Sequence, residues 1–290
     1  AVVGAACSGA SMGANAILSA AGIPMISYAS TNPGLSDASA YPLFYRVVPS
    51  DAIQGPAGAD MMTDAGVGNE SLAILHMTND YGSGLANSVK DAWDINGALC
   101  AAGMQGYEES VTDFSAMVTA IIDEEGCEAV YLSSYITDAA MILEELDTQG
   151  FEGKIFAGDG PAGPGLYEAL TDHALAEGMT VSAPRAGSTY GDFEARYDAN
   201  AADVGSIKTY VLTAYDATMV IGKAATMSGE IDANIKTTGS GYEGASGIID
   251  FLDNGDIGGN GYDICSYGGA DETYTCGKYW TAVGKVQSSA

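Results

Sequence analysis

The sequence predicts an α/β protein whose sheets are parallel and doubly wound. Short apolar runs alternate with longer segments of helical periodicity, a rhythm typical of β-α-β units. The 290 residues are 47% hydrophobic, which is enough to build two domains with buried cores. In addition, the apolar run at 23–26 leads into small polar residues, as strands do at the ligand-binding edge of open α/β sheets.

The first fifty residues are expected to form strands around one helix. Apolar residues follow one another without a polar face in each strand, which indicates burial on both sides. The strands are expected at 1–4, 23–28 and 44–48, and the helix at 12–21. Small polar residues follow the first two strands, at Ser8 and at Ala29 to Thr31, so the two loops could face one cleft.

From Asp51 the pattern becomes a regular alternation of helix and strand. Asp51 can cap a helix that runs to residue 64, because aspartate is favoured at helix starts. Strands are then expected at 71–76, 98–105, 129–133, 154–157 and 179–182. Helices are expected at 83–93, 114–124 (capped by Asp113), 137–146 and 166–170. The rhythm predicts one complete lobe at about 53–182 with a parallel doubly wound sheet.

After Pro184 the pattern becomes helical. Helices are expected at 193–200, 210–227 and 231–237, and strand-like segments at 246–252 and 262–283. The segment from Asp253 to Asp263 is rich in acidic residues, but its spacing fails the EF-hand calcium loop. A turn between strands is the preferred interpretation.

The charge of the chain excludes several partners. With 38 acidic and 10 basic residues the formal charge is -28, which repels nucleic acid and anionic lipid. No apolar run approaches the length of a membrane span, so no membrane insertion of this chain is expected.

Motifs for catalysis and cofactor binding are weak. Residues 158–163 fit the dinucleotide pattern G-x-G-x-x-G, but Pro161 removes an N–H and Asp159 would face the pyrophosphate. No Walker lysine, nucleophile elbow or zinc spacing is present. A hydrolase using Asp159 would need a second carboxylate or metal ligand in the same cleft. The sequence therefore predicts no enzyme, no cofactor and no metal.

Five cysteines suggest an oxidising compartment. Cys100 and Cys127 begin consecutive predicted strands, and parallel neighbours would bring them within bridging range. Cys265 and Cys276 flank an Asp/Gly-rich segment and could pair across a hairpin. Cys7 is left over, either as a free buried thiol or with a partner elsewhere.

A series of short motifs resembles the Leu/Ile/Val-binding family of ABC-transporter periplasmic substrate-binding proteins, which have the type I periplasmic binding fold. The order and spacing of the motifs hold to about residue 220. They are CSGA at 7–10, GIPMIS at 22–27, ASTNP at 29–33, YRVVPSD at 45–51, QGP at 54–56, DYGSGLA at 80–86, TDFS at 112–115 and GDG at 158–160.

The resemblance implies a two-lobe protein. Residues 1–52 and 184–258 would form the amino-terminal lobe, and 53–183 and 259–290 the carboxyl-terminal lobe. Family members usually have a further stretch before this start, so we expect the amino-terminal part of the pattern to be missing and the first lobe to be incomplete. In the family the cysteine equivalent to Cys7 pairs upstream.

The resemblance also implies a function. The chain would be the extracytoplasmic or periplasmic receptor of an ABC importer, with the permease as its partner. Its ligand would be an amino acid, branched-chain or otherwise apolar by default. Two alternatives stay open: a ligand-sensing receptor domain of the same fold, and a binder of an amide, urea or aromatic acid.

The first group of candidate site residues suits a carboxylate. Hydroxyls and reachable N–H groups can hold a carboxylate without a full positive charge. In the family a serine hydroxyl, a backbone N–H and a threonine do so. The matching residues are Ser8, Ala29, Ser30 and Thr31.

The second group suits an ammonium and a side chain. Asp159 follows a predicted strand, and by resemblance it would face the ligand's ammonium, although the family often has Glu there. A turn aspartate is the alternative. Tyr81 and Tyr135 also follow strands and would contact the ligand by resemblance, or be single surface aromatics. Tyr210 matches an aromatic pocket position, with a core helix residue as its alternative.

Overall fold

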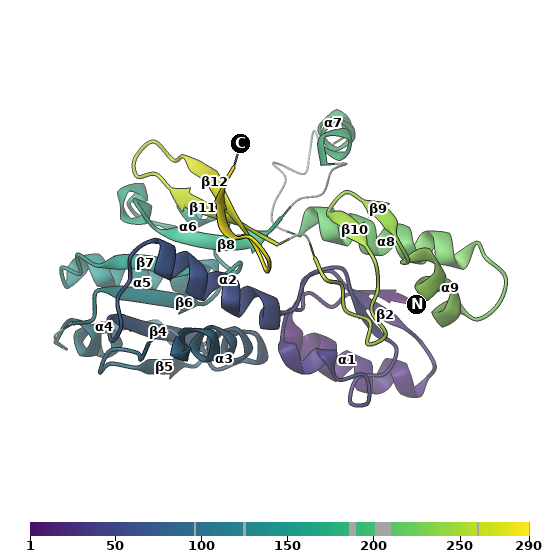
Figure 1. Cartoon of the computed structure of the whole chain (residues 1–290), viewed down its shortest axis with the longest axis horizontal. Helices are drawn as coiled ribbons and strands as arrows, with labels where there is room; N and C mark the ends of the chain where they lie inside the picture. Colours follow the sequence, from purple (N-terminus) through teal and green to yellow (C-terminus); the bar gives the residue numbers. More distant parts are fainter. Residues whose placement is uncertain (96, 124–125, 186–189, 201–209, 260, 290) are drawn as a thin grey trace. The chain divides into compact units, whose positions relative to one another are not determined.

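The computed structural model describes residues 1–95, 97–123, 126–185, 190–200, 210–259 and 261–289. The chain divides into two compact units (Figure 1). Unit 1 comprises Ala1–Ser50 and Pro184–Asn260, and unit 2 comprises Asp51–Ala183 and Gly261–Ala290. The expected lobe boundaries were 52/53, 183/184 and 258/259. The interpretation of the units as two binding lobes stays a prediction.

Unit 1 is built on a parallel sheet of β1 (Val2–Val3), β2 (Met25–Ser27) and β3 (Phe44–Arg46), in that order. Its other strands form the antiparallel hairpin of β9 (Tyr242–Gly244) and β10 (Gly247–Ile249). Its helical elements are α1 (Ser8–Ala20), η1 (Pro33–Ser36), α7 (Tyr190–Asn200), α8 (Val211–Ala225) and α9 (Ile231–Thr238). The hairpin β9–β10 was not predicted as two strands.

In the sheet of unit 1, β2 and β3 are buried on both faces, and their side chains alternate between the faces. The expectation that the first strand is also buried was wrong, because β1 is the edge strand and its Val2 and Val3 are exposed. Met25 and Phe44 pack with Leu35 and, from α1, Met12 and Leu18. On the other face, Ile26 and Tyr45 pack with residues of α8 and α9, namely Ala217, Val220, Ala224 and Ile235. The continuous apolar runs expected for these strands thus follow from a covered sheet.

Unit 2 contains a mixed sheet with strand order β13-β12-β11-β8-β7-β6-β4-β5 in the described part of the chain. From β4 to β8 all pairs are parallel, as predicted. Their bounds are β4 (Leu72–Met77), β5 (Met104–Tyr107), β6 (Ala129–Ser133), β7 (Lys154–Ala157) and β8 (Thr180–Pro184).

The carboxyl-terminal strands extend the sheet in antiparallel fashion, as the expected hairpin around Cys265 and Cys276 requires. β11 (Tyr262–Tyr267), β12 (Tyr274–Thr281) and β13 (Lys285–Ser288) pair antiparallel with one another. The reason is connection length: the links between them are too short for the crossover that a parallel pair requires. The predicted strand-like segment 262–283 is therefore two strands, and β13 was not predicted.

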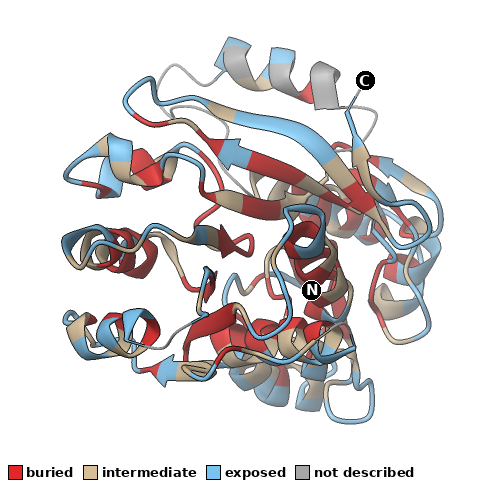
Figure 2. Ribbon diagram, turned by 60° about the vertical axis from the view of Figure 1, so that its left-hand side comes forward, coloured by how far each residue is buried: buried red, intermediate tan, exposed pale blue. Residues whose placement is uncertain are grey.

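Helices cover both faces of the sheet in unit 2. Leu72 and Ile74 of β4 pack with α2 (Asp51–Asp64) and α3 (Asp80–Asp94). Ala73 and Leu75 pack on the other face with residues of α4 (Ser115–Ile122), α5 (Ile136–Thr148) and α6 (Gly165–Ala169). A 3-10 turn, η2 (His173–Ala176), follows α6. Figure 2 shows the buried residues on the helix faces that line the sheet.

Several element boundaries differ from those expected. β5 begins at Met104 instead of 98, because residues 100–103 form a turn in which the Gly103 N–H donates to the Cys100 carbonyl. Asp113 accepts a hydrogen bond from the Ser115 N–H, but the residue before α4 is Phe114. Residue 124, where that helix was expected to end, lies outside the described residues.

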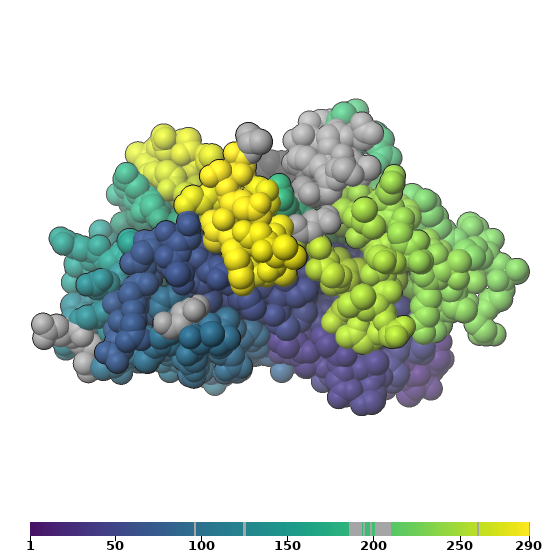
Figure 3. Space-filling model, in the orientation of Figure 1, coloured from purple at the N-terminus to yellow at the C-terminus, as the bar shows by residue number. Residues whose placement is uncertain are grey.

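The carboxyl-terminal strands, yellow in Figure 3, lie against α2 and form polar contacts with it. Trp280 Nε1 donates to Asp60 Oδ2 at 2.6 Å, and Lys285 Nζ lies 3.0 Å from the same oxygen. Lys278 pairs with Asp64 at 2.6 Å. Although they come last in the sequence, these strands belong to unit 2 together with residues more than 200 positions earlier.

Disulfides join Cys100 to Cys127 and Cys265 to Cys276, the pairs that were expected. The reason given for the first pair was wrong, because β4 lies between β5 and β6. The two cysteines meet at the start of β4 instead. The Cys100 N–H donates to the Leu72 carbonyl, and the Ala129 N–H to that of Ser71. Cys7 is a free thiol and is exposed.

No helix in the described ranges is long and apolar enough to cross a lipid bilayer.

Candidate functional site

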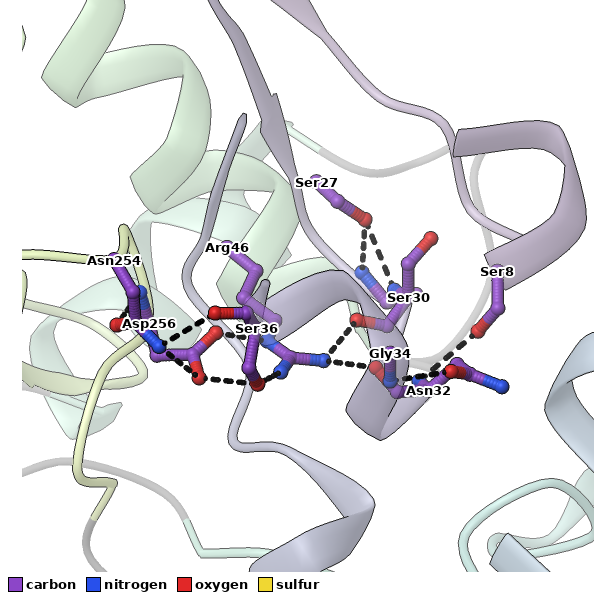
Figure 4. A network of polar contacts seen from close by, with 10 residues as sticks. Ser8, Ser27, Ser30, Asn32, Gly34, Ser36, Arg46, Asn254 and Asp256 are labelled. Atoms are coloured by element: carbon purple, nitrogen blue, oxygen red, sulfur yellow. Dashed lines mark hydrogen bonds and ion pairs between the residues drawn. The ribbon is translucent and has the colours of Figure 1, made fainter. Parts of the chain in front are cut away.

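In unit 1 the candidate residues gather around the loop that follows β2. Ser27, the last residue of β2, is fully buried and shapes this loop. Its hydroxyl donates to the Ala5 carbonyl at 2.6 Å and accepts the Ser30 N–H at 2.9 Å and the Ala29 N–H at 3.3 Å (Figure 4). The N–H groups of Ala29 and Ser30 are thus used within unit 1.

Ser8, in α1, and Thr31, in the loop after β2, are two further candidate residues of unit 1. The helix α1 begins four residues earlier than expected, so Ser8 is in its first turn, with 1% of its surface exposed. Ser8 Oγ accepts the Asn32 N–H at 3.2 Å (Figure 4). Thr31 is fully buried, and its hydroxyl has no hydrogen-bond partner among the described residues. A buried hydroxyl without a partner is costly, which marks it as a candidate ligand contact.

The Ser30 hydroxyl is occupied within unit 1, and the expected ligand contact of Ser30 stays a prediction. Its hydroxyl lies 2.8 Å from Ser11 Oγ and 3.1 Å from the Ala6 carbonyl oxygen. These partners lie in α1 and in the segment before it, so the side chain ties the loop to the amino-terminal segment. The structure brings Ser8, Ala29, Ser30 and Thr31 together.

Tyr210 also belongs to unit 1 but is not joined to this group by any described contact. It directly precedes α8, with left-handed backbone angles (φ 70°). Its carbonyl accepts hydrogen bonds from Thr213 Oγ1 and the Ala214 N–H. Its expected place in a side-chain pocket stays a prediction.

In unit 2 three candidate residues form one cluster at the carboxyl ends of β4, β6 and β7. Asp159 follows β7 and is 1% exposed. Its Oδ1 accepts the Tyr81 hydroxyl at 2.9 Å, and the Gly160 N–H donates to that hydroxyl at 3.0 Å. The ring of Tyr81 stacks on that of Tyr135, with centroids 5.0 Å apart and planes 6° apart.

The two tyrosines lie at helix starts. Tyr81, expected in a loop, is in the first turn of α3, because Asn79 caps that helix by accepting the Gly82 N–H at 2.8 Å. Tyr135 directly precedes α5. Helices that follow parallel strands begin at the same edge of the sheet, so both rings reach the cluster.

Glycine next to Asp159 is required by close packing. A Cβ atom on Gly160 would lie 2.1 Å from the Ser134 carbonyl oxygen and 2.8 Å from the Tyr81 hydroxyl. Gly160 therefore permits the close approach of the Asp159 segment to Tyr81 and Ser134.

The Asp159 carboxylate carries a charge that its surroundings only partly compensate. Burial raises the pKa of Asp159 to about 6, while the Tyr81 hydroxyl and the neighbouring Gln54 amide lower it less strongly. Its second oxygen, Oδ2, is buried and accepts no hydrogen bond from the described residues. Burial raises the pKa of Tyr81, and the charge of Asp159 raises it further. The Tyr81 phenol therefore stays protonated and donates its hydrogen bond to Asp159.

Gln54 and Ser27 were missed as site residues. Gln54, in α2, is fully buried, and its amide donates to the Ser182 carbonyl at 3.2 Å and to Ser182 Oγ at 3.1 Å. Both residues lie inside quoted motifs, QGP and GIPMIS. A polar residue in an otherwise apolar, buried stretch was the available signal.

The raised pKa of Asp159 predicts a pH dependence of stability. Below the ordinary value of 3.8 the carboxyl is protonated in both the folded and the unfolded chain. As the pH rises from about 4 to about 6, the unfolded chain releases this proton first, so the free energy of unfolding falls across that window. The two values differ by an amount that corresponds to about 3 kcal/mol.

Urea denaturation of the wild type and of Asp159→Asn between pH 4 and pH 7 tests this prediction. The stability advantage of the variant should grow by about 2 kcal/mol between pH 4 and pH 6 and approach its full value of about 3 kcal/mol near pH 7. Subtracting the two proteins cancels the titration of the other carboxylates. A difference that stays constant with pH would contradict the burial effect.

Comparisons with known proteins support one family. A profile of the receptor family ligand binding region matches residues 1–269. The chain is 28% identical over 262 residues to a leucine-, isoleucine-, valine-, threonine- and alanine-binding protein of Pseudomonas aeruginosa. It is 31% identical over 240 residues to a leucine-specific-binding protein of Salmonella typhimurium. These alignments span 88% and 78% of this chain but 68% and 60% of the two relatives.

Solved structures share the fold. A leucine binding protein of Thermotoga maritima matches with a TM-score of 0.83 at 23% identity, over 97% of this chain and 79% of that one. A branched-chain amino acid transporter substrate binding protein of Streptococcus pneumoniae, solved with isoleucine, matches with a TM-score of 0.78 at 22% identity, over 94% and 76%. The chain therefore belongs to the family of the receptor ligand binding region and has the type I periplasmic binding fold, and the Leu/Ile/Val-binding proteins that it resembles are substrate-binding proteins and not enzymes.

Proposed function

We propose that this chain is the extracytoplasmic substrate-binding protein of an ABC importer and that it binds an amino acid, of branched-chain or other apolar type. The observation that carries the proposal is the Asp159 carboxylate. It is 1% exposed, and one of its oxygens has no hydrogen-bond donor among the described residues. The permease of the importer is the implied partner.

An ammonium group suits Asp159 better than any other ligand group. A buried carboxylate is stable only when it is paired and hydrogen-bonded, and an ammonium supplies both the charge and the donor. A carboxylate ligand at the same point would be repelled. The Tyr81 hydroxyl fixes the other oxygen of Asp159, so the unpaired oxygen has a defined direction. The stacked ring of Tyr135 is a candidate wall for the ligand's side chain.

The loop of unit 1 suits the ligand's carboxylate. The Thr31 hydroxyl is buried and lacks a partner in the described chain, and the Ser8 hydroxyl, which accepts the Asn32 N–H, carries a proton of its own to donate. Ser8 is also in the first turn of α1, where the helix dipole favours an anion. The proposal treats the two groups as half-sites, each described within its own unit: the loop after β2 for the ligand's carboxylate and the Asp159 cluster for its ammonium.

An extracytoplasmic location agrees with the chemistry of the chain. The disulfides Cys100–Cys127 and Cys265–Cys276 persist in oxidising compartments and are rare in the cytosol.

Calorimetric titration with a panel of amino acids tests the function. The panel should include L-leucine together with two analogues, 4-methylpentanoate, which lacks the ammonium, and leucinamide, which lacks the carboxylate. We expect at least one apolar amino acid to bind, and both analogues to bind at least tenfold more weakly, because each leaves buried groups of one half-site unpaired.

Two results would contradict the proposal. Binding of 4-methylpentanoate as tight as that of leucine would remove the ammonium from the mechanism and favour an acid-binding protein. If no amino acid bound while an amide or urea bound tightly, the family assignment would stand but the proposed ligand class would be wrong.

A further inference from the structure

The guanidinium of Arg46 is completely buried in unit 1, at the end of β3. Its donors reach three different segments (Figure 4). Nε donates to Asp256 Oδ1 at 2.6 Å, and Nη2 donates to Ser36 Oγ at 2.7 Å. Nη1 donates to the carbonyl oxygens of Ser30 at 3.2 Å and of Asn32 at 3.0 Å. The last two acceptors flank Thr31, whose hydroxyl has no partner among the described residues.

Asp256 is itself held in place on the opposite side. Its Oδ2 accepts the Ser36 hydroxyl at 2.7 Å and the Asn254 amide at 3.1 Å. The segment that carries Asp256 is joined to β3, because the Arg46 N–H donates to the Gly255 carbonyl at 3.1 Å. Gly255 has φ +86°, and a Cβ there would lie 2.0 Å from the Phe44 carbonyl oxygen. The turn expected at this acidic segment is thus a support for Arg46.

A buried ion pair of this kind is expensive. Removing two charges from water costs several kcal/mol per ion, and the cost is met only when the geometry is good and the remaining donors are satisfied. An apolar pair would stabilise the fold equally well. What an apolar pair could not do is bond both carbonyl groups around Thr31 from a rigid planar fork.

We propose that Arg46, held by Asp256 and Ser36, is a positioning residue that presets the ligand loop, residues 29–32, before the ligand arrives. The guanidinium fixes the backbone on both sides of Thr31, so the Thr31 hydroxyl is held at a defined place. Preorganisation of this kind strengthens binding because the loop's ordering cost is met during folding. The ligand part of the inference rests on the proposed function, whereas the loop-ordering part does not.

The test compares Arg46→Lys with a matched control, Ile235→Ala. Lysine keeps the positive charge but loses the fork, so the ion pair to Asp256 can persist while the two carbonyls are released. Ile235 is fully buried in the core of unit 1 and has no described contact with the loop. The control therefore lowers the Tm of the same unit without touching the loop.

Two readouts separate positioning from stability. The first is amide hydrogen exchange of residues 29–32 in the ligand-free protein. After correction for each variant's change in global stability, the exchange rate should be about tenfold higher in Arg46→Lys and unchanged in Ile235→Ala. The second is the Kd for L-leucine, which should rise about tenfold in Arg46→Lys and less than twofold in Ile235→Ala at a comparable fall in Tm.

Loop exchange that is unchanged in folded Arg46→Lys would overturn the proposal, and so would an equal rise of Kd in both variants. If Arg46→Lys does not fold, Ser36→Ala, which removes one support only, should show the same pattern at smaller amplitude. Because the exchange readout needs no ligand, a wild type that binds no amino acid of the panel would count against the proposed function and leave the loop-ordering test intact.

Discussion

Replacing Asp159 with asparagine is expected to raise the dissociation constant for L-leucine by roughly 30-fold or more at pH 7.5. The change keeps the shape of the side chain and removes the charge that would face the ammonium. Truncating one partner of a buried charge pair costs roughly 2–5 kcal/mol, and each 1.4 kcal/mol is a factor of ten. The Asp159→Asn variant would also lose the preference for leucine over 4-methylpentanoate.

The control for this experiment is Asp138→Asn. Asp138 lies in α5 of the same unit, is 7% exposed, and burial raises its pKa as well. It has no proposed ligand contact, so its variant should bind as the wild type does. Unaltered leucine binding by Asp159→Asn would assign Asp159 a structural role and leave the ammonium without a partner.

The Asp159→Asn substitution should change affinity and stability in opposite directions. The folded wild type carries a buried charge at neutral pH whose cost is on the order of 3 kcal/mol, since the pKa of Asp159 is raised to about 6. Asp159→Asn should therefore be more stable and bind more weakly. The same cause predicts that the wild type's leucine affinity falls about tenfold between pH 7 and pH 5, as the carboxyl takes up a proton.

Removing the Cys100–Cys127 disulfide should lower the free energy of unfolding by roughly 3.5 kcal/mol, on the chain-entropy estimate for its loop. The cysteines are 27 positions apart, and their bond closes a loop that contains β5 and α4. Cys100 is 4% exposed, so the double variant Cys100→Ala/Cys127→Ala also loses packing at the start of β4. Urea denaturation at pH 7 measures the change.

The second disulfide provides the comparison. Cys265 and Cys276 are 11 positions apart, so Cys265→Ala/Cys276→Ala should lose less, roughly 2.8 kcal/mol by the same relation. Neither bond touches Asp159 or the loop after β2 in the described contacts, so leucine binding should survive in both variants. A larger loss at the shorter loop would show that local strain or packing outweighs chain entropy at these sites.

Local apolar patterning predicted the strands well where the sheet is covered on both faces. The expected strands 129–133 and 154–157 coincide with β6 and β7. The ends of these two strands could be predicted because a polar residue or glycine follows the last buried residue of each strand. The helix starts were less accurate: α1 and α3 begin before the expected positions, at Ser8 and Asp80, since small and polar residues in a first turn carry no apolar signal.

The candidate site was predictable only as separate pieces. Ser8, Thr31, Tyr81 and Asp159 follow strands, and strand ends are where ligands bind in open α/β sheets. Their pairwise relations were not predictable. The stacking of Tyr81 on Tyr135, the unpaired oxygen of Asp159 and the occupied hydroxyl of Ser30 each depend on packing between segments that are distant in the sequence.

By itself the sequence determined the alternation of strands and helices, the acidic surface, the family resemblance and the hairpin pairing of Cys265 with Cys276. Each of these depends on composition or on spacing along the chain. The tertiary structure alone decided that β4 lies between β5 and β6, that β11 joins the sheet beside β8, and that Arg46 meets Asp256 from 210 positions away. The physical reason is that side-chain periodicity records which residues are buried, whereas the identity of the partner depends on how distant segments pack.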